Sequence, residues 1–325
     1  MSWRPDPARF LADLETVPAG LRALADRLVD PWPVTERPDR VVLLGLGSSR
    51  YAALVGAAAL RAAGIDAVAE HAGASAAFPG GAGTLAVGIS ASGTTPQTVA
   101  ALGRHAGAGS RTVAVTAAPD ASTALGEVAA GHVDLACGPE AGGIACRTFR
   151  HTVVRLLQLR TQLAGDDVAQ VARAARLTAV ATDDLLARRP TWLPAVVEHL
   201  EDGSSFLIAP AERLGSAAQA ALTLREGPRR VATACESNDW PHVDVYLTKP
   251  LGPDYRAILG AGSDADAEIA RWIEERGARL AVVGPGVDPV GGPAVRYRGD
   301  DDRTVRLLAD ALVAELAAAA LWTGV

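Results

Sequence analysis

The stretch VGISASGTTPQTVAAL, residues 87–102, joins three kinds of local sequence. Its first residues are apolar and end a run that begins at residue 84, as expected for a buried strand. The loop SASGTT at residues 90–95 has a hydroxyl or a glycine at five of its six positions, which is too polar for a core. A helical pattern opens at Pro96. The stretch therefore predicts a strand, a binding loop and a helix, the repeating order of α/β proteins.

The same order recurs on both sides of this stretch. Apolar runs predict strands at residues 40–47, 66–71, 84–90, 111–117 and 132–137, with helices at 51–64 and 96–107. A leading amphipathic helix is predicted over 7–29. Long helical patterns fill 147–202, with breaks at Gly165-Asp166-Asp167 and at Arg189-Pro190. The rhythm then restarts, with predicted strands at 205–210, 255–262 and 278–286 and helices at 213–226, 265–277 and 302–321.

Two series of alternating strands and helices in 325 residues predict two α/β units of similar design. Each unit is expected to be a three-layer α/β/α sandwich around a mainly parallel sheet, with helices on both faces. We expect an N-terminal helix in residues 1–30, a first unit with connector helices in 31–190, and a second unit in 191–325.

Composition excludes several classes of function. A net charge of -6 and a pI of about 5.6 argue against a nucleic-acid partner. The apolar runs are shorter than the roughly 20 residues of a membrane span, and charges stand where a signal peptide would be apolar. The three cysteines and six histidines lack metal-binding spacing. We expect a cytoplasmic protein without a membrane contact, a metal or a cofactor.

A second loop resembles the first in character. GLGSS, residues 45–49, follows a predicted strand and opens a helix, but it lacks the third glycine of a dinucleotide motif and the Gly-Lys-Ser/Thr of a P-loop. Hydroxyls and backbone amides at two helix N-termini, without a lysine, suit the phosphate of a small molecule. The alternative is two N-caps that only satisfy helix ends. The candidate phosphate-binding residues are Ser48, Ser49, Ser90, Ser92 and Thr95.

These loops resemble those of the double sugar isomerase (SIS) domain family, in particular the isomerase half of glucosamine-6-phosphate synthases without its glutaminase domain. The resemblance covers roughly residues 30–325. Residues 47–49 stand at the family's Gly-Thr-Ser loop, and SASGTT matches Ser-Gln-Ser-Gly-x-Thr with Ala91 in place of the amide side chain. Looser matches are GPEAGGIACRTF (138–149), AALTLRE (220–226) and Pro241-His242. The resemblance implies two SIS-type units.

The resemblance also implies roles for further residues. Glu226 matches the base that moves a proton between C1 and C2 of a sugar, and His242 matches the ring-opening histidine. Glu226 closes a predicted helix, where the negative helix end raises a carboxylate pKa. Gly47, Ile144 and Ala145 stand at positions that imply contacts with the sugar. In the family the histidine comes from a neighbouring subunit, which implies a homodimer with shared active sites.

Departures from the family pattern keep other functions open. Gln219 and Thr223 replace an acid and a lysine ahead of the base, and the chain ends AALWTGV without the family's tail lysine. Lys249 is the only lysine, so the familiar Schiff-base route is not available. The expected function is a phosphosugar aldose–ketose isomerase acting through an enediol. The alternatives are a fructosamine-phosphate deglycase or deaminase, and a non-catalytic phosphosugar sensor.

Overall fold

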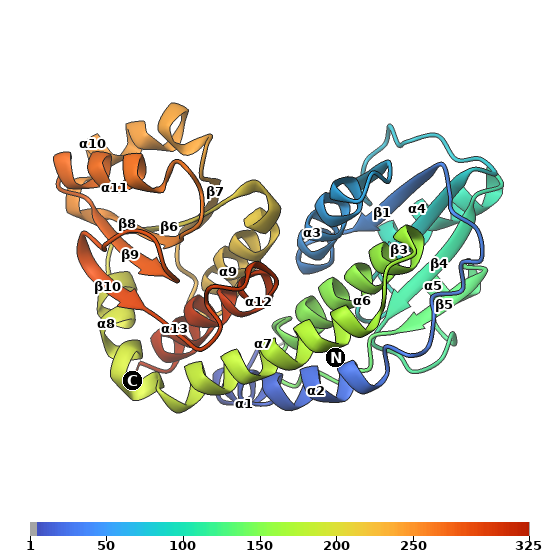
Figure 1. Cartoon of the computed structure of the whole chain (residues 1–325), viewed down its shortest axis with the longest axis horizontal. Helices are drawn as coiled ribbons and strands as arrows, with labels where there is room; N and C mark the ends of the chain where they lie inside the picture. Colours follow the sequence, from blue (N-terminus) through green and yellow to red (C-terminus); the bar gives the residue numbers. More distant parts are fainter. Residues whose placement is uncertain (1–4, 325) are drawn as a thin grey trace. The chain divides into compact units, whose positions relative to one another are not determined.

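The computed structural model describes residues 5–324 and contains two compact units, each built on one five-stranded parallel sheet (Figure 1). The sheet-A unit consists of Ala19–Pro139 and Arg147–Arg176. The sheet-B unit consists of the described residues up to Pro18, of Glu140–Cys146 and of the residues from Leu177 onward. The predicted two-unit α/β fold is confirmed. The boundaries 31–190 and 191–325 stay a prediction.

Sheet A has the strand order β2-β1-β3-β4-β5, and all of its pairs are parallel. Four of its strands lie within predicted apolar runs, and β5 begins one residue before the predicted run 132–137. The strands are β1 (Arg40–Gly45), β2 (Ala67–His71), β3 (Thr84–Ile89), β4 (Arg111–Thr116) and β5 (Gly131–Asp134). After β1 the chain forms β2 on one side of that strand and then crosses to form β3 on its other side. The sheet therefore changes direction between β1 and β3, where open α/β sheets bind ligands.

Both faces of sheet A are covered, because successive strand residues point to opposite faces. Leu43 and Val87 belong to a core cluster with α3 (Ser48–Ala62) and α6 (Arg147–Ala164). Leu44 and Ala86, one residue away in each strand, belong to a second cluster with α4 (Pro96–Gly107) and α5 (Ala124–Glu127). This packing fixes the helices that begin at the β1 and β3 ends of the sheet.

Sheet B has the order β10-β9-β8-β6-β7 and is also parallel. The strands β6, β8 and β9 were predicted, whereas β7 and β10 at the two edges were not. The strands are β6 (Ser204–Ala209), β7 (Ala232–Glu236), β8 (Tyr255–Gly260), β9 (Arg279–Val283) and β10 (Gly291–Val295). β6 lies beside β8, so this sheet changes direction in the same way as sheet A.

Helices cover both faces of sheet B. Leu207 and Ala281 belong to the cluster with α8 (Arg189–Glu201), α9 (Leu214–Glu226) and α13 (Ala311–Thr323). Ile208 and Val282 belong to the cluster with α11 (Asp266–Glu275) and the short turns after β7. The remaining helices are α1 (Pro7–Glu15), α2 (Val17–Asp26), α7 (Ala169–Ala187), α10 (Thr248–Leu251) and α12 (Arg303–Ala309). The short 3₁₀ helices η1 to η4 are Ala211–Arg213, Trp240–His242, Asp244–Leu247 and Gly252–Asp254.

Two predicted helices are each divided in the structure. The helix predicted over 7–29 is α1 followed by α2, with a cap at Thr16, whose hydroxyl donates to the carbonyl of Asp13 at 2.7 Å. The helix predicted over 302–321 is α12 followed by α13, with Asp310 between them. Asp310 forms an ion pair with Arg213 at 2.6 Å, and both are nearly buried. Thr16 and Asp310, the polar residues at the two divisions, thus each bond to a partner: the carbonyl of Asp13 for Thr16 and the side chain of Arg213 for Asp310.

Candidate functional site

The loop at residues 90–95 follows β3 and is shaped by its own hydroxyl groups. Oγ of buried Ser90 lies 2.9 Å from Oγ1 of Thr95. Oγ of Ser92 lies 2.9 Å from Oγ1 of Thr94 and accepts a hydrogen bond from the Thr94 amide at 3.2 Å. Ser92 and Thr94 are exposed. The loop therefore presents the exposed hydroxyls of Ser92 and Thr94 beside the partly buried pair of Ser90 and Thr95, which fixes its shape.

Gly93 is required by the conformation of this loop. Its φ is +66°, in the left-handed region that side chains disfavour. A Cβ at this position would lie 2.5 Å from Oγ1 of Thr123, the N-cap of α5. The Gly93 carbonyl also accepts a hydrogen bond from the Leu125 amide at 2.9 Å. The loop is thus pressed against α5, and this contact holds its backbone in place.

The first turns of α3 and α4 begin beyond the carboxyl ends of neighbouring strands, since β1 pairs with β3 in parallel. Over the described chain, neither N-cap, Gly47 for α3 and Thr95 for α4, makes a side-chain capping hydrogen bond. The Thr95 hydroxyl is instead engaged with Ser90. Amides at such helix ends carry partial positive charge and bind anions. The five candidate phosphate residues therefore gather at one edge of sheet A.

Arg50 is a candidate that the sequence analysis did not assign. It lies in the first turn of α3, directly after Ser48 and Ser49. Its Nε atom is buried and has no hydrogen-bond partner among residues 5–324. The sequence signal for Arg50 is a positively charged residue in the first turn of a helix whose N-terminus could bind an anion. Its positive charge would add to that of the helix end.

Glu226 is the last residue of α9 in the sheet-B unit and is partly buried. Burial raises the pKa of its carboxyl above the ordinary value, against the opposite effect of the positive charges of Arg225 and Arg229. The carbonyl end of the helix acts in the same direction as burial. A raised pKa brings a carboxylate closer to the range in which it can accept and return a proton near neutral pH.

The segment at residues 140–146 packs beside this helix end. A Cβ on Gly227 would lie 3.6 Å from Cδ1 of Ile144, and the Ala145 carbonyl accepts a hydrogen bond from Nε2 of Gln219 at 2.6 Å. The Ile144 side chain is fully buried. Ile144 and Ala145 thus lie against the helix that carries Glu226, and Ile144 could contact a ligand only through its backbone.

Gln219 and Thr223 are uncharged residues on the buried side of α9. Both side chains are fully buried. The Thr223 hydroxyl donates to the Gln219 carbonyl, one turn earlier, at 3.0 Å, and Gln219 is bonded to Ala145. Both residues therefore hold the local structure together, and Glu226 is the acidic group at this end of the helix.

The sequence around His242 predicts a turn-like loop that runs into a strand. His242 does lie in the turns after β7, at the end of η2, but the residues that follow form η3 and α10 instead of a strand. His242 is exposed, and its amide donates to the Asp239 carbonyl at 2.9 Å. Within the described part of the chain, no hydrogen bond or ion pair joins His242 to Glu226, although both belong to the sheet-B unit.

Trp240 anchors the segment that carries His242. Its ring is fully buried, and its Nε1–H donates to the Tyr255 hydroxyl at 2.7 Å. Tyr255 in turn stacks on Phe206 of β6, with ring centroids 3.8 Å apart. The sequence favours a loop-anchoring role for Trp240 over a platform on which a sugar could stack, and this burial leaves its ring no surface for stacking.

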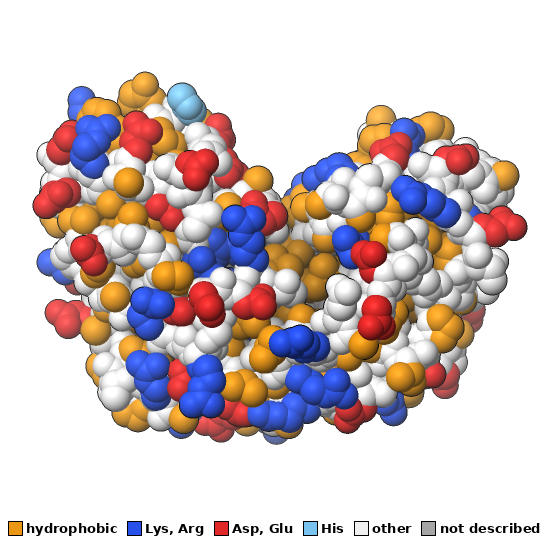
Figure 2. Space-filling model, in the orientation of Figure 1, with side chains coloured by type: hydrophobic (Ala, Val, Ile, Leu, Met, Phe, Trp, Pro, Cys, Tyr) orange, Lys and Arg blue, Asp and Glu red, His pale blue; other side chains and the backbone are white. Residues whose placement is uncertain are grey.

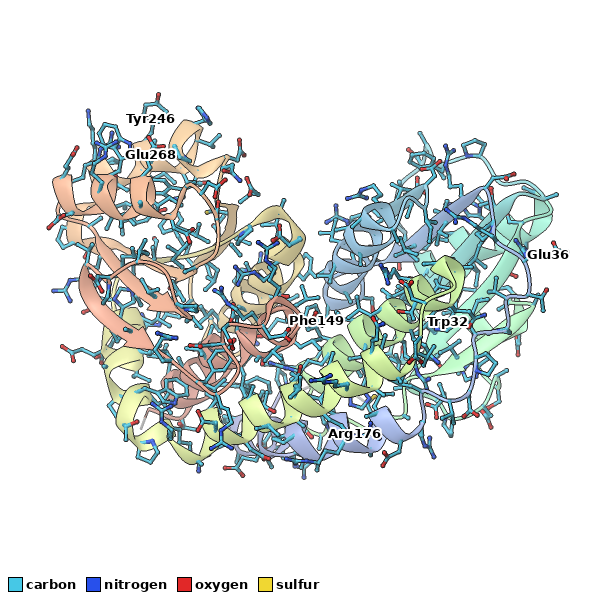
Figure 3. All side chains as sticks on the ribbon, in the orientation of Figure 1. Trp32, Glu36, Phe149, Arg176, Tyr246 and Glu268 are labelled. Carbon is cyan, nitrogen blue, oxygen red and sulfur yellow. The ribbon has the colours of Figure 1, made fainter. Side chains whose placement is uncertain are left out.

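Apolar side chains are exposed beside His242. Val243, Tyr246 and Leu247 are 54%, 67% and 41% exposed. Figure 2 shows hydrophobic side chains beside a histidine at the end of the unit that carries α10 and α11. Figure 3 shows Tyr246 pointing away from the fold at this end. Three large apolar side chains on one short segment form a surface that favours contact with another molecule.

Two properties of the described chain bear on other classes of protein. Among residues 5–324, no group of three or more His, Cys, Asp or Glu side chains is placed to hold a metal ion. None of the helices in that range combines the length and hydropathy that a membrane span needs.

The fold defines the class of the protein: it is a two-unit α/β protein, and its fold matches those of solved enzymes that act on sugar phosphates according to their names. The chain aligns to the C-terminal domain of glucosamine-fructose-6-phosphate aminotransferase from Francisella tularensis with a TM-score of 0.82 and 14% identity, over 97% of this chain and 96% of that one. It aligns to tagatose-6-phosphate ketose/aldose isomerase from Escherichia coli with a TM-score of 0.72 and 13% identity, over 99% and 95% of the two chains.

The sequence is related to one particular enzyme. It is 29% identical over 269 residues to the isomerizing glutamine–fructose-6-phosphate aminotransferase of Aeropyrum pernix. The match covers 76% of this chain and 41% of that relative, so the chain is homologous to part of it. No protein-family model matches the sequence. The resemblance to the isomerase part of such enzymes is confirmed.

Proposed function

We propose that the protein is an isomerase that interconverts the aldose and ketose forms of a sugar phosphate or amino-sugar phosphate. One observation carries the proposal: two helix N-termini without side-chain caps and two hydroxyl-rich loops lie at the edge where sheet A changes direction. The relatives named above act on sugar phosphates, according to their names. A cytoplasmic location is part of the proposal, since no disulfide joins the cysteines of the described chain.

The phosphate would be held at this edge without lysine. Ser48 and Ser49 would donate from the first turn of α3, and Ser90, Ser92 and Thr95 from the loop before α4. Helix-end amides and hydroxyl donors suit a phosphate dianion because they carry no charge of their own to be desolvated. Arg50 would supply the one full positive charge.

Glu226 would carry out the proton transfer. Its carboxylate removes the proton from C2 of the open-chain aldose, which leaves an enediol, and the same group returns the proton to C1. A second proton moves from the C2 hydroxyl to the C1 oxygen in the same process, so the product is the ketose with no net change in atoms. The raised pKa of Glu226 supports this role.

His242 would open the sugar ring by moving a proton from the anomeric hydroxyl to the ring oxygen. We propose that it acts in the site of a second subunit of a homodimer. Its exposure, and the exposure of Val243, Tyr246 and Leu247 beside it, support this arrangement. The backbones of Gly47, Ile144 and Ala145 would contact the sugar.

The substrate has to be found before the reaction can be measured. A thermal-shift screen over hexose, hexosamine and pentose phosphates, with the parent sugars as controls, should show stabilisation that depends on the phosphate group. Loss of that stabilisation in Ser90→Ala/Ser92→Ala would assign it to the loop.

The test of the base is Glu226→Gln, assayed by exchange of the substrate C2 proton with solvent deuterium. We expect exchange to fall by about 10³-fold or more, with ligand stabilisation retained, as for loss of a catalytic base. Glu274→Gln, an exposed glutamate on α11, is the matched control. Exchange that is unchanged in Glu226→Gln would refute the assignment.

The neutral pair Gln219 and Thr223 favours a second candidate. Because both side chains are buried in structural hydrogen bonds, α9 lacks two charged groups that the family pattern has. The protein would then be a phosphosugar sensor without turnover, or a deglycase that releases an amine from a fructosamine phosphate. Stabilisation by a sugar phosphate without C2 exchange would support the sensor, and amine release would support the deglycase.

A further inference from the structure

A groove of about 490 Å³ lies between α1, α8 and α13 of the sheet-B unit. Leu316 and Ala319, both buried, form its floor on α13, and the partly buried Leu11, Leu193 and Val197 form its walls. None of the residues assigned above to phosphate binding or catalysis lines this groove. Its volume is that of sites that bind small organic molecules.

The rim of the groove carries negative charge. Glu198 and Glu201 lie three residues apart on α8 and are exposed, and in the described chain neither has an ion pair. The rim cation, Arg189, is already paired with Glu15 at 2.5 Å. The groove therefore offers two uncompensated carboxylates above an apolar floor.

The backbone of α8 adds an acceptor to the same rim. Pro194 lies inside the helix and has no N–H, so the Pro190 carbonyl lacks the donor that it would have one turn later. Pro190 and Pro194 both line the groove. The polar groups that the groove offers are thus acceptors, apart from the already paired Arg189 and the Thr323 hydroxyl at one end.

We propose that this groove binds a small organic cation with an apolar body, such as an alkyl or aryl amine. The apolar part would cover Leu316 and Ala319, and the ammonium group would lie between Glu198 and Glu201. Charge complementarity selects a cation over an acid of the same shape. The proposal does not depend on the function of the sheet-A edge.

The test uses three probes with one chain length and three head groups: octylammonium, 1-octanol and octanoate. Binding to the full chain is measured by calorimetry and by thermal shift at pH 7 and low salt. We expect octylammonium to bind tightest, octanol more weakly and octanoate weakest. The advantage of octylammonium should shrink with added salt, because rim charges are screened.

Two variants separate charge from shape. Glu198→Gln/Glu201→Gln should weaken octylammonium by about tenfold and leave octanol unchanged, as expected for partly exposed charge pairs. Glu274→Gln on α11 is the matched control and should change nothing. Ala320→Leu, which fills the groove from α13, should weaken all three probes.

The proposal is overturned if the three probes bind equally, which would indicate a purely apolar surface for a second copy or a partner helix. It is also overturned if no probe binds, or if Glu198→Gln/Glu201→Gln keeps the full preference for octylammonium. Circular dichroism of each variant confirms that the fold is retained. An isomerase assay is not needed, so failure here and failure of the proposed isomerase are distinguished.

Discussion

At the residue scale, the candidate phosphate loop depends on one glycine more than on any hydroxyl. The hydroxyls of Ser90, Ser92 and Thr95 hydrogen-bond to partners within the loop. Gly93 instead sets the backbone path, because no side chain fits between it and Thr123. Loss of one hydroxyl removes one donor, whereas a side chain at residue 93 would move them all.

Gly93→Ala tests this dependence. We expect the substitution to destabilise the fold by about 2–4 kcal/mol, from left-handed strain plus the overlap with Thr123, and to abolish stabilisation by sugar phosphates. Gly109→Ala is the matched control: its φ is +82°, but its Cβ would meet nothing within 4 Å. It should cost only about 1 kcal/mol. Urea unfolding measures both, and equal costs would contradict the steric argument.

The raised pKa of Glu226 predicts a pH dependence of stability. Between its ordinary pKa and the raised one, the folded state holds a proton that the unfolded state has released. Stability therefore falls as pH rises through that window and is constant above it. Glu226→Gln removes this slope, so the variant should be more stable than the wild type at pH 7 and indistinguishable from it below about pH 4. Urea unfolding of both proteins across this range would refute the prediction if the curves stay parallel.

At the element scale, the turns after β7 form an exposed segment held by buried anchors. Trp240 is hydrogen-bonded to Tyr255 on β8. Arg276, the C-cap of α11, donates to the carbonyl of Val245 and, at 3.0 Å, to the hydroxyl of Thr248. His242 lies between the anchors at 240 and 245. Its backbone is thereby positioned although its side chain is exposed.

A double-mutant cycle on Trp240→Phe and Tyr255→Phe tests the main anchor. Each single variant should lose about 1–3 kcal/mol, because it leaves one buried polar group without its partner. The double variant should cost less than the sum of the two by about 1 kcal/mol. Hydrogen exchange should quicken at residues 237–251 and stay unchanged in α4. Additive costs would show that the hydrogen bond does not hold the segment.

The strands that were predicted correctly from the sequence are mainly those with apolar residues on both faces of the sheet, because both faces are buried. After their first one or two residues, the strands β1, β3, β6 and β8 are apolar. The edge strands β7 and β10 were missed because ATACE is half exposed and GGPAV contains glycines and a proline. The strand predicted after His242 rested on valines and a tyrosine, of which Val243 and Tyr246 are exposed on turns.

At the scale of the whole molecule, the candidate residues divide between the two units. The phosphate candidates belong to the sheet-A unit, and Glu226, His242, Ile144 and Ala145 belong to the sheet-B unit. Sequence could predict the phosphate loops, because strand, loop and helix are local. It could not have predicted that residues 140–146 pack with the second sheet, since that packing depends on contacts distant in sequence.

A site shared between subunits makes a prediction that no single variant can test. Glu226→Gln and His242→Ala should each be inactive alone. If His242 acts in the partner's site, a hybrid dimer holds one site with both defects and one with neither. Mixing the two variants in equal amounts, with unfolding and refolding to exchange subunits, should restore about a quarter of wild-type activity. Tyr246→Asp, which places a charge on the exposed apolar segment, should lower both dimer content and recovery. No recovery, in a mixture shown by sedimentation to be dimeric, would place His242 and Glu226 in the same subunit's site.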